Sequence, residues 1–512
     1  MTAQALWEHV AALDSTVLVG LKEAGRARGV DTRGRSLVPK SLWEPLSQRV
    51  AALGVEVLYV EETLHPLVQL RLTGPAQIEA LRRAPFVEYV EPASFDATGF
   101  LLEPGCGSSA PVQFGNAQAP GDIVPYTLFR HRVPQAWSIA PTAGAGVTVG
   151  VVDTGTSVYQ PQLQSQFATG MSAGRTIVYD YTDPSGQNGP PLWHDSCGHG
   201  TKALGLIAAP RDGRSIVGVA YRANAYAVRA LDDVYAHVGQ WLEVREGIRR
   251  AAEASRIVSM AFGASTGNSG VSNTIRFYYH DIEYKRLFIG AAGSSTQFFT
   301  GMTYPSTLEE VMAVTGTTDG FSPCSGCNYG EKVFLVAYTG GESTGLNEGE
   351  INGFGKSSGA TSVISGIAAL VMSHYPNLSR DQVVERLRQA GSRSGSRDPR
   401  IGHGVVNAEA AVGGIKDVRI TGPGVVSSSG TYTFTAAVEG GSGPFAYAWS
   451  SGGTGSGGSG ASQTRSYHIA TGQESYTFPV EVSVTDQSTG STRTASWTVL
   501  VQGEGCGTMI NC

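Results

Sequence analysis

The sequence carries little charge, and that charge is nearly balanced. Charged residues make up 16% of the 512-residue chain, against about 25% in a typical soluble protein. Lys and Arg total 37 and Asp and Glu total 43, which gives a formal net charge of -6 without any basic run. Nucleic-acid binding depends on clustered positive charge that neutralises phosphates. We therefore expect no nucleic-acid partner.

Long apolar runs and a signal-peptide pattern are also missing. No segment approaches about 18 uninterrupted apolar residues, so we expect no membrane span. The first residues include Glu8 and Asp14 and have neither a basic start nor a continuous apolar stretch. Either the protein stays in the cytosol, or a signal was removed before this numbering begins.

Cysteine is scarce but even in number. The six cysteines form two close pairs and two single residues: Cys324 and Cys327, Cys506 and Cys512, Cys106 and Cys197. An even count is typical of disulfides in an oxidising compartment. A zinc site is disfavoured, because only one CxxC is present where a paired arrangement would be needed. We therefore expect disulfides and a secreted, extracellular protein.

What is present is a globular composition, with 41% hydrophobic residues and 67 glycines, divided into regions of different pattern. Residues 1–97 show strand and helix patterns in the order β-α-β-β-α-β, at 17–21, 42–53, 55–61, 67–72, 75–83 and 87–90. This order predicts a ferredoxin-like α+β module. Residues 98–124 are rich in Gly, Pro and Ala and predict an exposed connector.

The remaining chain changes character near residue 413. Residues 125–413 alternate helical stretches with strand-like runs at 146–152, 225–230, 257–260, 287–292 and 311–314. Such alternation predicts an α/β domain with a parallel sheet between layers of helices. Residues 414–512 carry short alternating strands at 430–438, 445–449, 476–484 and 492–501, separated by Gly-rich turns. They predict an all-β sandwich.

Three short segments of the α/β region carry residues suited to catalysis. Asp153 ends an apolar strand, where ligands bind in open α/β sheets, although a turn-forming Asp is the plain alternative. His199 lies in a Gly-His-Gly that opens an Ala-rich helix, where it could also be a packing or capping residue. A metal site with His194 is disfavoured, because a spacing of five residues separates the two rings on a helix.

The third segment places Ser358 among small residues before an apolar helix. A helix N-terminus favours developing negative charge, and a serine becomes a nucleophile when a histidine takes its proton. An N-cap serine is the alternative. A phosphate-binding loop is excluded, because Glu350 stands where that motif needs glycine.

The three segments occur in the order Asp, His, Ser, and here residues 125–412 resemble the subtilisin-like serine proteases. The resemblance is carried by VVDTG, GHGT, SSGATSVISGIAAL, YPSTLEEVMAVTGTTD and GHGVVNAEAAV. It implies a three-layer α/β domain and a serine endopeptidase that hydrolyses peptide bonds through an acyl-enzyme. By the same resemblance, Asp153, His199 and Ser358 would be the catalytic triad.

The chain departs from the family pattern around the nucleophile. Lys356 and Ser357 stand where Gly-Thr usually precedes the nucleophile, and Ser362 replaces a typical Pro. Ser294 replaces the oxyanion-hole Asn of the family, unless Ser295 or Gln297 takes that role. Losing one oxyanion donor typically costs about 100–1000-fold in rate.

The resemblance also implies a substrate site and roles for the flanking regions. The walls of this site would be small and apolar, and the site would accept an extended peptide with an apolar side chain. The residues that would form the walls are Val238, Gly239, Trp241, Ala261, Phe262, Gly263, Ala292 and Gly293. Packing in a helix is the alternative for Trp241. Residues 1–97 look like an inhibitory propeptide, removed by autoprocessing in the connector, and residues 414–512 look like an immunoglobulin-like or PKD-like module.

The expected partners are polypeptide substrates and the protein's own propeptide, and we expect a monomer. No cofactor is expected; structural calcium occurs in the family, but no Asp-rich loop identifies a site and we assign no metal ligand. Two alternatives remain open. One is a catalytically impaired pseudoprotease that acts as a binding protein, suggested by Ser294 and Lys356. The other is an acyltransferase or peptide ligase that uses the same acyl-enzyme.

Overall fold

The structure is a computed structural model of the chain, and its elements fall into two compact units. It describes residues 1–22, 29–30, 36–37, 48–50, 52–61, 67–93, 121–182, 191–234, 240–294, 301–451, 459–469 and 474–503. The first unit comprises residues 1–131 and 142–406, and the second comprises residues 132–141 and 407–512. Each unit is described by itself.

The N-terminal part of the first unit is an antiparallel sheet with two helices. Its elements are α1 (Ala3–Ala11), β1 (Thr16–Leu21), β2 (Gly29–Val30), β3 (Ser36–Leu37), β4 (Glu56–Glu61), β5 (Leu67–Arg71), α3 (Pro75–Arg83) and β6 (Val87–Pro92). The four longer strands lie in the order β4-β5-β1-β6, all antiparallel. The strands and the helix expected from residue 55 onward are confirmed. The expected helix at 42–53 falls largely outside the described residues.

Helix α1 was not foreseen from the sequence. Thr2 caps it, because its hydroxyl accepts a hydrogen bond from the Ala5 N–H at 3.1 Å. The helix buries Ala3, Leu6 and Val10 in the core of this sheet. Three apolar residues at this spacing form one helical face, and the acidic residues around them obscured it.

The larger part of the first unit is built on a parallel sheet of seven strands in the order β13-β12-β11-β10-β7-β9-β8. The strands are β7 (Thr148–Asp153), β8 (Ile177–Tyr181), β9 (Asn224–Arg229), β10 (Ile257–Met260), β11 (Leu287–Ala291), β12 (Val311–Thr317) and β13 (Val333–Tyr338). The predicted parallel sheet is confirmed. A hairpin of β14 (Gly341–Thr344) and β15 (Ile351–Phe354) lies outside it.

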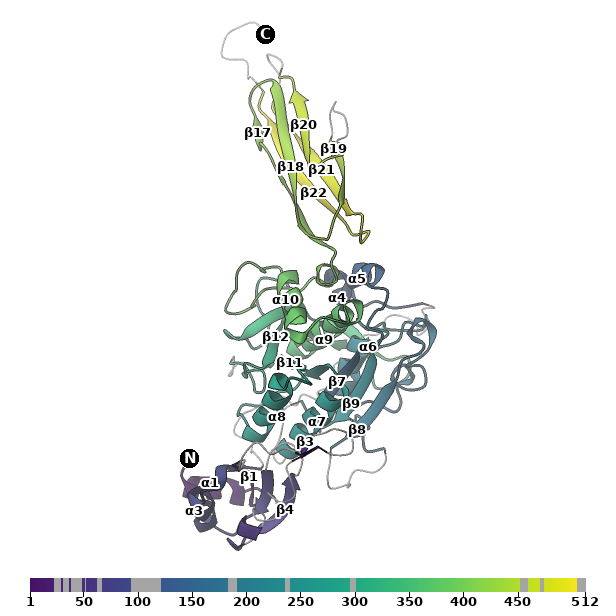
Figure 1. Ribbon diagram of the computed structural model, residues 1–512. Helices are drawn as coiled ribbons and strands as arrows, with labels where there is room; N and C mark the ends of the chain where they lie inside the picture. Colours follow the sequence, from purple (N-terminus) through teal and green to yellow (C-terminus); the bar gives the residue numbers. More distant parts are fainter. Residues whose placement is uncertain are drawn as a thin grey trace. The chain divides into compact units, whose positions relative to one another are not determined.

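Helices cover both faces of this sheet (Figure 1). The helices of this part of the unit are α4 (Tyr126–Arg130), α6 (His199–Ala208), α7 (Trp241–Ala254), α8 (Ser269–His280), α9 (Lys356–His374) and α10 (Arg380–Ala390). Helices α6 and α9 pack together on one face, and α7 and α8 on the other (Figure 1). This is the three-layer α/β arrangement expected from the alternating pattern.

Burial explains why the central elements read as continuous apolar or small residues. Strand β7 is hydrophobic on both faces, and its residues from 149 onward are buried. This is usual in a parallel sheet that has helices on both faces. Helix α9 has buried residues all around its axis, from Ser357 to Ser373, so it runs through the core. Among the described residues, no helix is long and apolar enough to cross a membrane.

The second unit combines two short helices with two β-sheets, in which all strand pairs except β17–β22 are antiparallel. The helices are α5 (Val133–Ile139) and α11 (Ala408–Ala411), and the strands are β16 (Ile415–Thr421), β17 (Val425–Val426), β18 (Gly430–Gly440), β19 (Phe445–Ser451), β20 (Ser462–Tyr467), β21 (Tyr476–Asp486) and β22 (Thr492–Val501). The sheets have the orders β16-β18-β20 and β17-β22-β21-β19. The expected all-β region is present, and β16 and β20 are strands that the sequence pattern did not indicate.

A buried carboxylate joins the helices of the second unit to its strands. Glu409, only 1% exposed, forms ion pairs with Arg132 and with Arg493, the latter at 3.4 Å, and it accepts a hydrogen bond from the Ser491 hydroxyl at 2.6 Å. Pairing with two arginines offsets the cost of burying the charge.

Candidate active site

Asp153, His199 and Ser358 all lie near the carboxyl ends of the parallel strands. Asp153 is the last residue of β7, His199 is the first residue of α6, and Ser358 lies in the first turn of α9. Loops and helix N-termini at this edge are the usual place for ligands in open α/β sheets. Segments up to 205 residues apart in the sequence thus converge there.

Asp153 and His199 form a buried hydrogen-bonded pair. The His199 Nδ1 atom lies 2.8 Å from Asp153 Oδ1, and the two residues are 7% and 1% exposed. Asp153 Oδ1 also accepts the Thr154 N–H at 2.8 Å. A carboxylate on Nδ1 fixes that nitrogen as the donor and leaves Nε2 as the acceptor of a proton.

A second buried carboxylate, Asp195, organises the turn before His199. Its Oδ1 accepts hydrogen bonds from the N–H groups of Cys197 and Gly198, at 3.0 and 2.7 Å. It also accepts the Thr154 hydroxyl at 2.9 Å, while Oδ2 accepts the N–H and hydroxyl of Thr201 at 2.8 and 2.6 Å. Five donors hold a carboxylate that is wholly buried. Sequence reasoning assigned Asp195 no role, although its place four residues before His199 was a usable signal.

Gly200 explains why glycine follows the histidine. A Cβ atom at Gly200 would lie 2.3 Å from the carbonyl oxygen of Gly155, in the turn after Asp153. Any larger residue would push α6 away from β7 and separate His199 from Asp153. The Phe354 ring packs edge-on against the His199 ring at 5.1 Å between centroids.

Lys202 lies one turn after His199 on α6. Its ammonium group is 5.9 Å from the centroid of the Phe354 ring. Burial lowers the pKa of Lys202, while the nearby carboxylates of Asp195, Asp153 and Glu350 act in the opposite direction. The Phe354 ring that contacts His199 therefore also lies near this ammonium group.

The Ser358 hydroxyl points to the end of β10 in this structure. Its Oγ donates a hydrogen bond to the Ala261 carbonyl at 3.0 Å, and no hydrogen bond between Ser358 and His199 occurs among the described contacts. Serine Oγ moves between rotamers by rotation about one bond. In structures without substrate, catalytic hydrogen bonds are often long or absent and form in the substrate complex.

Ser294 and Ser357 form a pair of hydroxyls beside Ser358. Their Oγ atoms are 3.0 Å apart, and either can be the donor. Ser294 also pairs with Cys327 through an isolated antiparallel bridge, and Cys327 is disulfide-bonded to Cys324. The segment that carries Ser294 is therefore attached to a covalently closed loop. Ser295 and Gln297, the alternative oxyanion donors, lie outside the described residues.

Lys356 holds an unusual backbone conformation just before these serines. Its φ is 53°, in the left-handed region that favours glycine. The family pattern has glycine here, and the structure shows that this chain keeps the left-handed turn with a lysine. A Cβ at Gly316 would meet the Lys356 carbonyl at 2.8 Å and Cys327 Sγ at 2.9 Å, so the turn packs directly on β12.

The predicted substrate-lining residues that the structure describes lie close to the same edge, but several of their backbone groups are already bonded. The Gly263 N–H donates to the Val234 carbonyl at 3.0 Å, and the Ala292 N–H donates to the Val314 carbonyl at 2.7 Å. Phe262 is 2% exposed and belongs to the core. Val238 and Gly239 lie outside the described residues.

Trp241 begins α7 and is 4% exposed. Its ring packs edge-on against Tyr304 at 5.8 Å. It thus contributes to the core between α7 and the segment around Tyr304, and its role as a wall of a substrate pocket stays a prediction.

The structure tests part of the expected disulfides and metal sites within the described ranges. Cys324 and Cys327 form a disulfide, which confirms that close pair. Cys197 is disulfide-bonded as well, and the other disulfide candidates, Cys106, Cys506 and Cys512, lie outside the described residues. No group of three or more His, Cys, Asp or Glu residues suited to a metal occurs in the described part of the chain.

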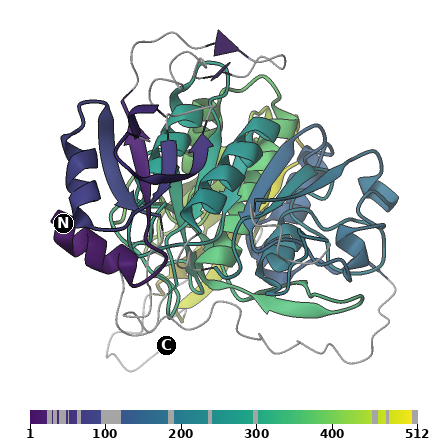
Figure 2. The ribbon, with the colours of Figure 1, turned by 90° about the horizontal axis from the view of Figure 1, so that it is seen from below.

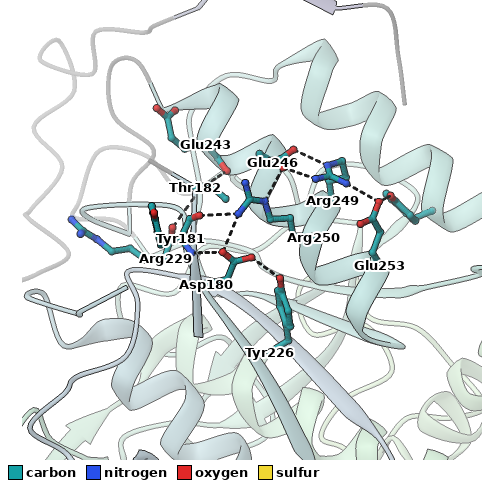
Figure 3. A network of polar contacts seen from close by, with 11 residues as sticks. Asp180, Tyr181, Thr182, Tyr226, Arg229, Glu243, Glu246, Arg249, Arg250 and Glu253 are labelled. Carbon is teal, nitrogen blue, oxygen red and sulfur yellow. Dashed lines mark hydrogen bonds and ion pairs between the residues drawn. The ribbon is translucent and has the colours of Figure 1, made fainter. Parts of the chain in front are cut away.

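A cavity of about 400 Å³ lies away from these residues, between the N-terminal sheet and α7. It is lined by Tyr59, Asp180, Tyr181, Thr182, Leu242, Glu246 and Arg250. Figure 3 shows the polar network beside it. Arg250 contacts Asp180 at 2.9 Å and Glu246 at 2.7 Å, and Arg249 contacts Glu246 and Glu253 at 2.5 and 2.7 Å.

Comparison with known proteins gives one consistent result. The profile of the Subtilase family matches residues 144–404. A thermostable alkaline protease of Halalkalibacterium halodurans is 30% identical over 278 residues, covering 52% of this chain and 68% of that protein. Thermitase of Thermoactinomyces vulgaris is 30% identical over 210 residues (40% and 67%), and subtilisin NAT of Bacillus subtilis subsp. natto is 26% identical over 293 residues (56% and 71%).

Proposed function

Because the chain belongs to the subtilase family and is a serine endopeptidase that acts on polypeptides, we propose that Asp153, His199 and Ser358 are its catalytic triad. The observation that carries the proposal is the buried Asp153–His199 pair, formed beside the α9 turn that bears Ser358. Buried, charge-bearing pairs of this kind are costly in a core without a function.

The mechanism follows from the roles these atoms can take. Ser358 rotates away from the Ala261 carbonyl and attacks the scissile carbonyl, while His199 Nε2 takes the hydroxyl proton. Asp153 holds the imidazole by its Nδ1 and stabilises the imidazolium. His199 then protonates the leaving amine, and water attacks the acyl-enzyme by the same steps in reverse. No cofactor takes part.

Negative charge on the substrate oxygen would develop at the N-terminus of α9. A 19-residue helix places the positive end of its dipole there. Ser294 is the side-chain donor we assign to this oxyanion, in place of the asparagine of the family. A hydroxyl reaches less far than an amide, so we expect slower turnover than an asparagine would give.

Residues 1–97 are proposed to form a ferredoxin-like inhibitory propeptide. The strand order β4-β5-β1-β6, with α3 between β5 and β6, supports that fold. One buried apolar cluster contains Leu18, Leu67 and Ala93 together with residues of α7, α8 and β10. The N-terminal strands therefore lie against these helices (Figure 2). Such a packed surface suits a chaperone-like contact that lasts until processing.

Glu91 supports the same interpretation. Both oxygens of its carboxyl group accept the Ser269 N–H at 3.0 Å, and one accepts the Gly270 N–H at 3.3 Å, at the start of α8. Free N–H groups at a helix N-terminus favour an acceptor of this type. Burial raises the pKa of Glu91, against the effect of these hydrogen bonds. Figure 3 shows the paired charges of α7. Tyr59 of β4 lines the same cavity as Glu246 and Arg250 of that helix.

The remaining regions complete a secreted zymogen. We propose domains at residues 1–97, 98–124, 125–413 and 414–512, with cleavage in the connector. The last region would be an immunoglobulin-like or PKD-like module that binds a surface or polymer or acts as a spacer; its two-sheet core supports this. Disulfides support an extracellular location.

The experiment is intact mass and casein hydrolysis for the full chain beside Ser358→Ala. We expect the wild type to lose an N-terminal fragment of about 10–13 kDa, from roughly 95–120 residues at about 110 Da each, and to digest casein. The variant should do neither. If both proteins stay intact and inert, the proposal is wrong, and the chain would be a pseudoprotease whose binding partner must be sought.

A further inference from the structure

One arginine of the second unit is buried in the β-sandwich, and no carboxylate of the described residues pairs with it. Arg465 is 5% exposed, and its Nε and Nη1 atoms are buried without a hydrogen-bond partner in the described part of the chain. The other arginines of this unit all have carboxylate partners: Arg132 and Arg493 pair with Glu409, and Arg419 pairs with Asp417. A buried guanidinium is costly unless an acceptor meets it.

A second donor lies two residues further along the same strand. Burial alternates along β20, so Arg465 and Tyr467 share the face of the strand that packs on the core. The Tyr467 hydroxyl is also buried without a hydrogen-bond partner among the described residues. Burial raises the pKa of Tyr467 to about 12, while the nearby guanidinium of Arg465 acts in the opposite direction. Neighbouring N–H and O–H groups thus point to one acceptor that no described residue supplies.

The position of Arg465 in the sandwich makes it reachable from one side. Strand β20 is an edge strand of the sheet β16-β18-β20, and β19 is an edge strand of the sheet β17-β22-β21-β19. The Trp449 Nε1–H of β19 donates to the carbonyl of Gly460, just before β20, at 2.8 Å. Arg465 therefore lies under an edge of the sandwich and not under a central strand, so a ligand can approach it laterally.

Aromatic rings extend from this strand to the surface. The ring centroids of Tyr432 and Tyr467 are 5.7 Å apart, those of Tyr467 and Phe478 are 5.1 Å apart, and those of Phe478 and Tyr476 are 6.2 Å apart. Tyr432 lies opposite Arg465 in the register of β18 and β20, and Tyr476 is 44% exposed. Aromatic rings with a few convergent polar groups are typical of ligand sites, and a flat ring packs well on the C–H face of a sugar. The combination favours a sugar that carries a carboxylate.

We propose that the β-sandwich of residues 414–512 binds an acidic polysaccharide, in which a uronate carboxylate accepts hydrogen bonds from Arg465 and Tyr467 and the sugar ring packs against Tyr476. A guanidinium suits a carboxylate, because its N–H groups lie in one plane and the group stays charged. This inference rests on the proposed binding role of the module and names its ligand class. Such binding holds the protease at a surface rich in uronate.

The test is isothermal titration calorimetry of the full-length Ser358→Ala protein with a short oligogalacturonate. The fully methyl-esterified oligomer is the matched ligand, because it keeps the sugar rings and loses the negative charges. We expect the acid form to bind at least about tenfold more tightly than the ester, which is the usual worth of a charge-assisted hydrogen bond. Acetate, which has the carboxylate without the rings, should bind more weakly than the acid oligomer.

Three further substitutions in the Ser358→Ala protein locate the site. Arg465→Gln should weaken binding of the acid form by about tenfold or more and leave binding of the ester unchanged. Tyr467→Phe removes one neutral hydrogen bond and should weaken binding by about threefold. The matched control is Arg419→Gln, which removes the same charge from β16 of the same sheet, where the side chain is 73% exposed. Its affinity should change by less than about twofold, which separates direct contact from net charge.

Equal affinity for the acid and the ester, no binding of either, or an unchanged affinity in Arg465→Gln overturns the inference. Tighter binding of oligoglutamate than of oligogalacturonate overturns the sugar as the ligand. If Arg465→Gln does not fold, the melting temperature of the Ser358→Ala protein decides, because the acid form should raise it more than the ester does. Casein hydrolysis tests the protease separately: a wild type as inert as Ser358→Ala refutes that activity, while the titration, made on an inactive chain, keeps its meaning.

Discussion

The two halves of the candidate active site are built very differently. On the histidine side, Asp153 and Asp195 accept a dense set of hydrogen bonds, and glycine at position 200 lets α6 approach β7 closely. On the serine side, a lysine occupies a left-handed position and the Ser358 hydroxyl bonds to Ala261. The side that orients the base matches the family pattern, while the side that bears the nucleophile departs from it.

The difference indicates which functional groups of the site can be replaced by other residue types and which cannot. A buried carboxylate has few substitutes, because removing it leaves several N–H groups without acceptors. The oxyanion site needs only a donor in the right place, and side chains other than an amide can supply one. Substitution is therefore expected on the serine side, where the chemistry tolerates more than one solution.

The strongest test of the histidine side is Asp153→Asn. The amide keeps the shape of the carboxylate but favours the wrong imidazole tautomer, so kcat should fall by about 10⁴-fold with little change in fold. Steady-state kinetics and a thermal melt measure both properties. A loss below about tenfold would mean that the Asp153–His199 pair is structural rather than catalytic.

The stability of the fold is also expected to depend on pH, through a histidine outside the Asp153–His199 pair. His131 is fully buried; its Nδ1–H donates to the Val406 carbonyl at 2.8 Å, and its Nε2 accepts the Tyr338 N–H at 2.9 Å. Burial lowers the pKa of His131 from 6.5 to about 4. The neutral ring therefore stabilises the fold above pH 6.5, and this contribution is lost as the pH falls toward 4.

We expect the free energy of unfolding to decrease by about 3 kcal/mol between pH 7 and pH 4 from this residue. Urea unfolding of the Ser358→Ala protein measures it without self-digestion. His131→Gln cannot become protonated, so its unfolding free energy should depend less on pH. Parallel pH curves for the two proteins would assign the acid sensitivity to other groups.

On the serine side, Ser294→Asn should raise kcat by about tenfold and leave KM nearly unchanged, because the added donor acts mainly in the transition state. Peptide anilide kinetics at saturating substrate measure this directly. Equal or lower kcat in a well-folded variant would contradict the assignment of Ser294 as a weaker oxyanion donor than asparagine.

The smallest expected effect concerns Lys356→Gly. Glycine adopts a φ near 53° without the steric cost that a lysine bears there, so the variant should be more stable by about 1 kcal/mol. Differential scanning calorimetry on the Ser358→Ala background would detect the shift. Lower stability would mean that contacts of the lysine side chain outweigh its backbone cost.

The fold was largely predictable, because its signals are local. Runs such as 257–260 and 75–83 match observed elements in their bounds, since apolar periodicity and a helix-starting proline act within one element. Helix α1 and strand β20 were missed. The first has only three buried residues, and the second buries Gln463 and Arg465, which do not read as a strand core.

The site was predictable only where residue types carry their own chemistry. Asp153, His199 and Ser358 stood out as titratable or nucleophilic residues in small-residue turns. Asp195 did not, because its importance lies in five hydrogen bonds to groups that are scattered in the sequence. The Ser294–Ser357 contact joins residues 63 positions apart, and no sequence period marks it.

The most direct measurement of the central claim is to label the full chain with a fluorophosphonate and locate the label by peptide mass mapping. Three serines, Ser294, Ser357 and Ser358, lie together at this site, and only the one that His199 activates should react. The account predicts a single label on Ser358 and none in Ser358→Ala. A label on Ser357 or Ser294, or an unlabelled wild type, would contradict it.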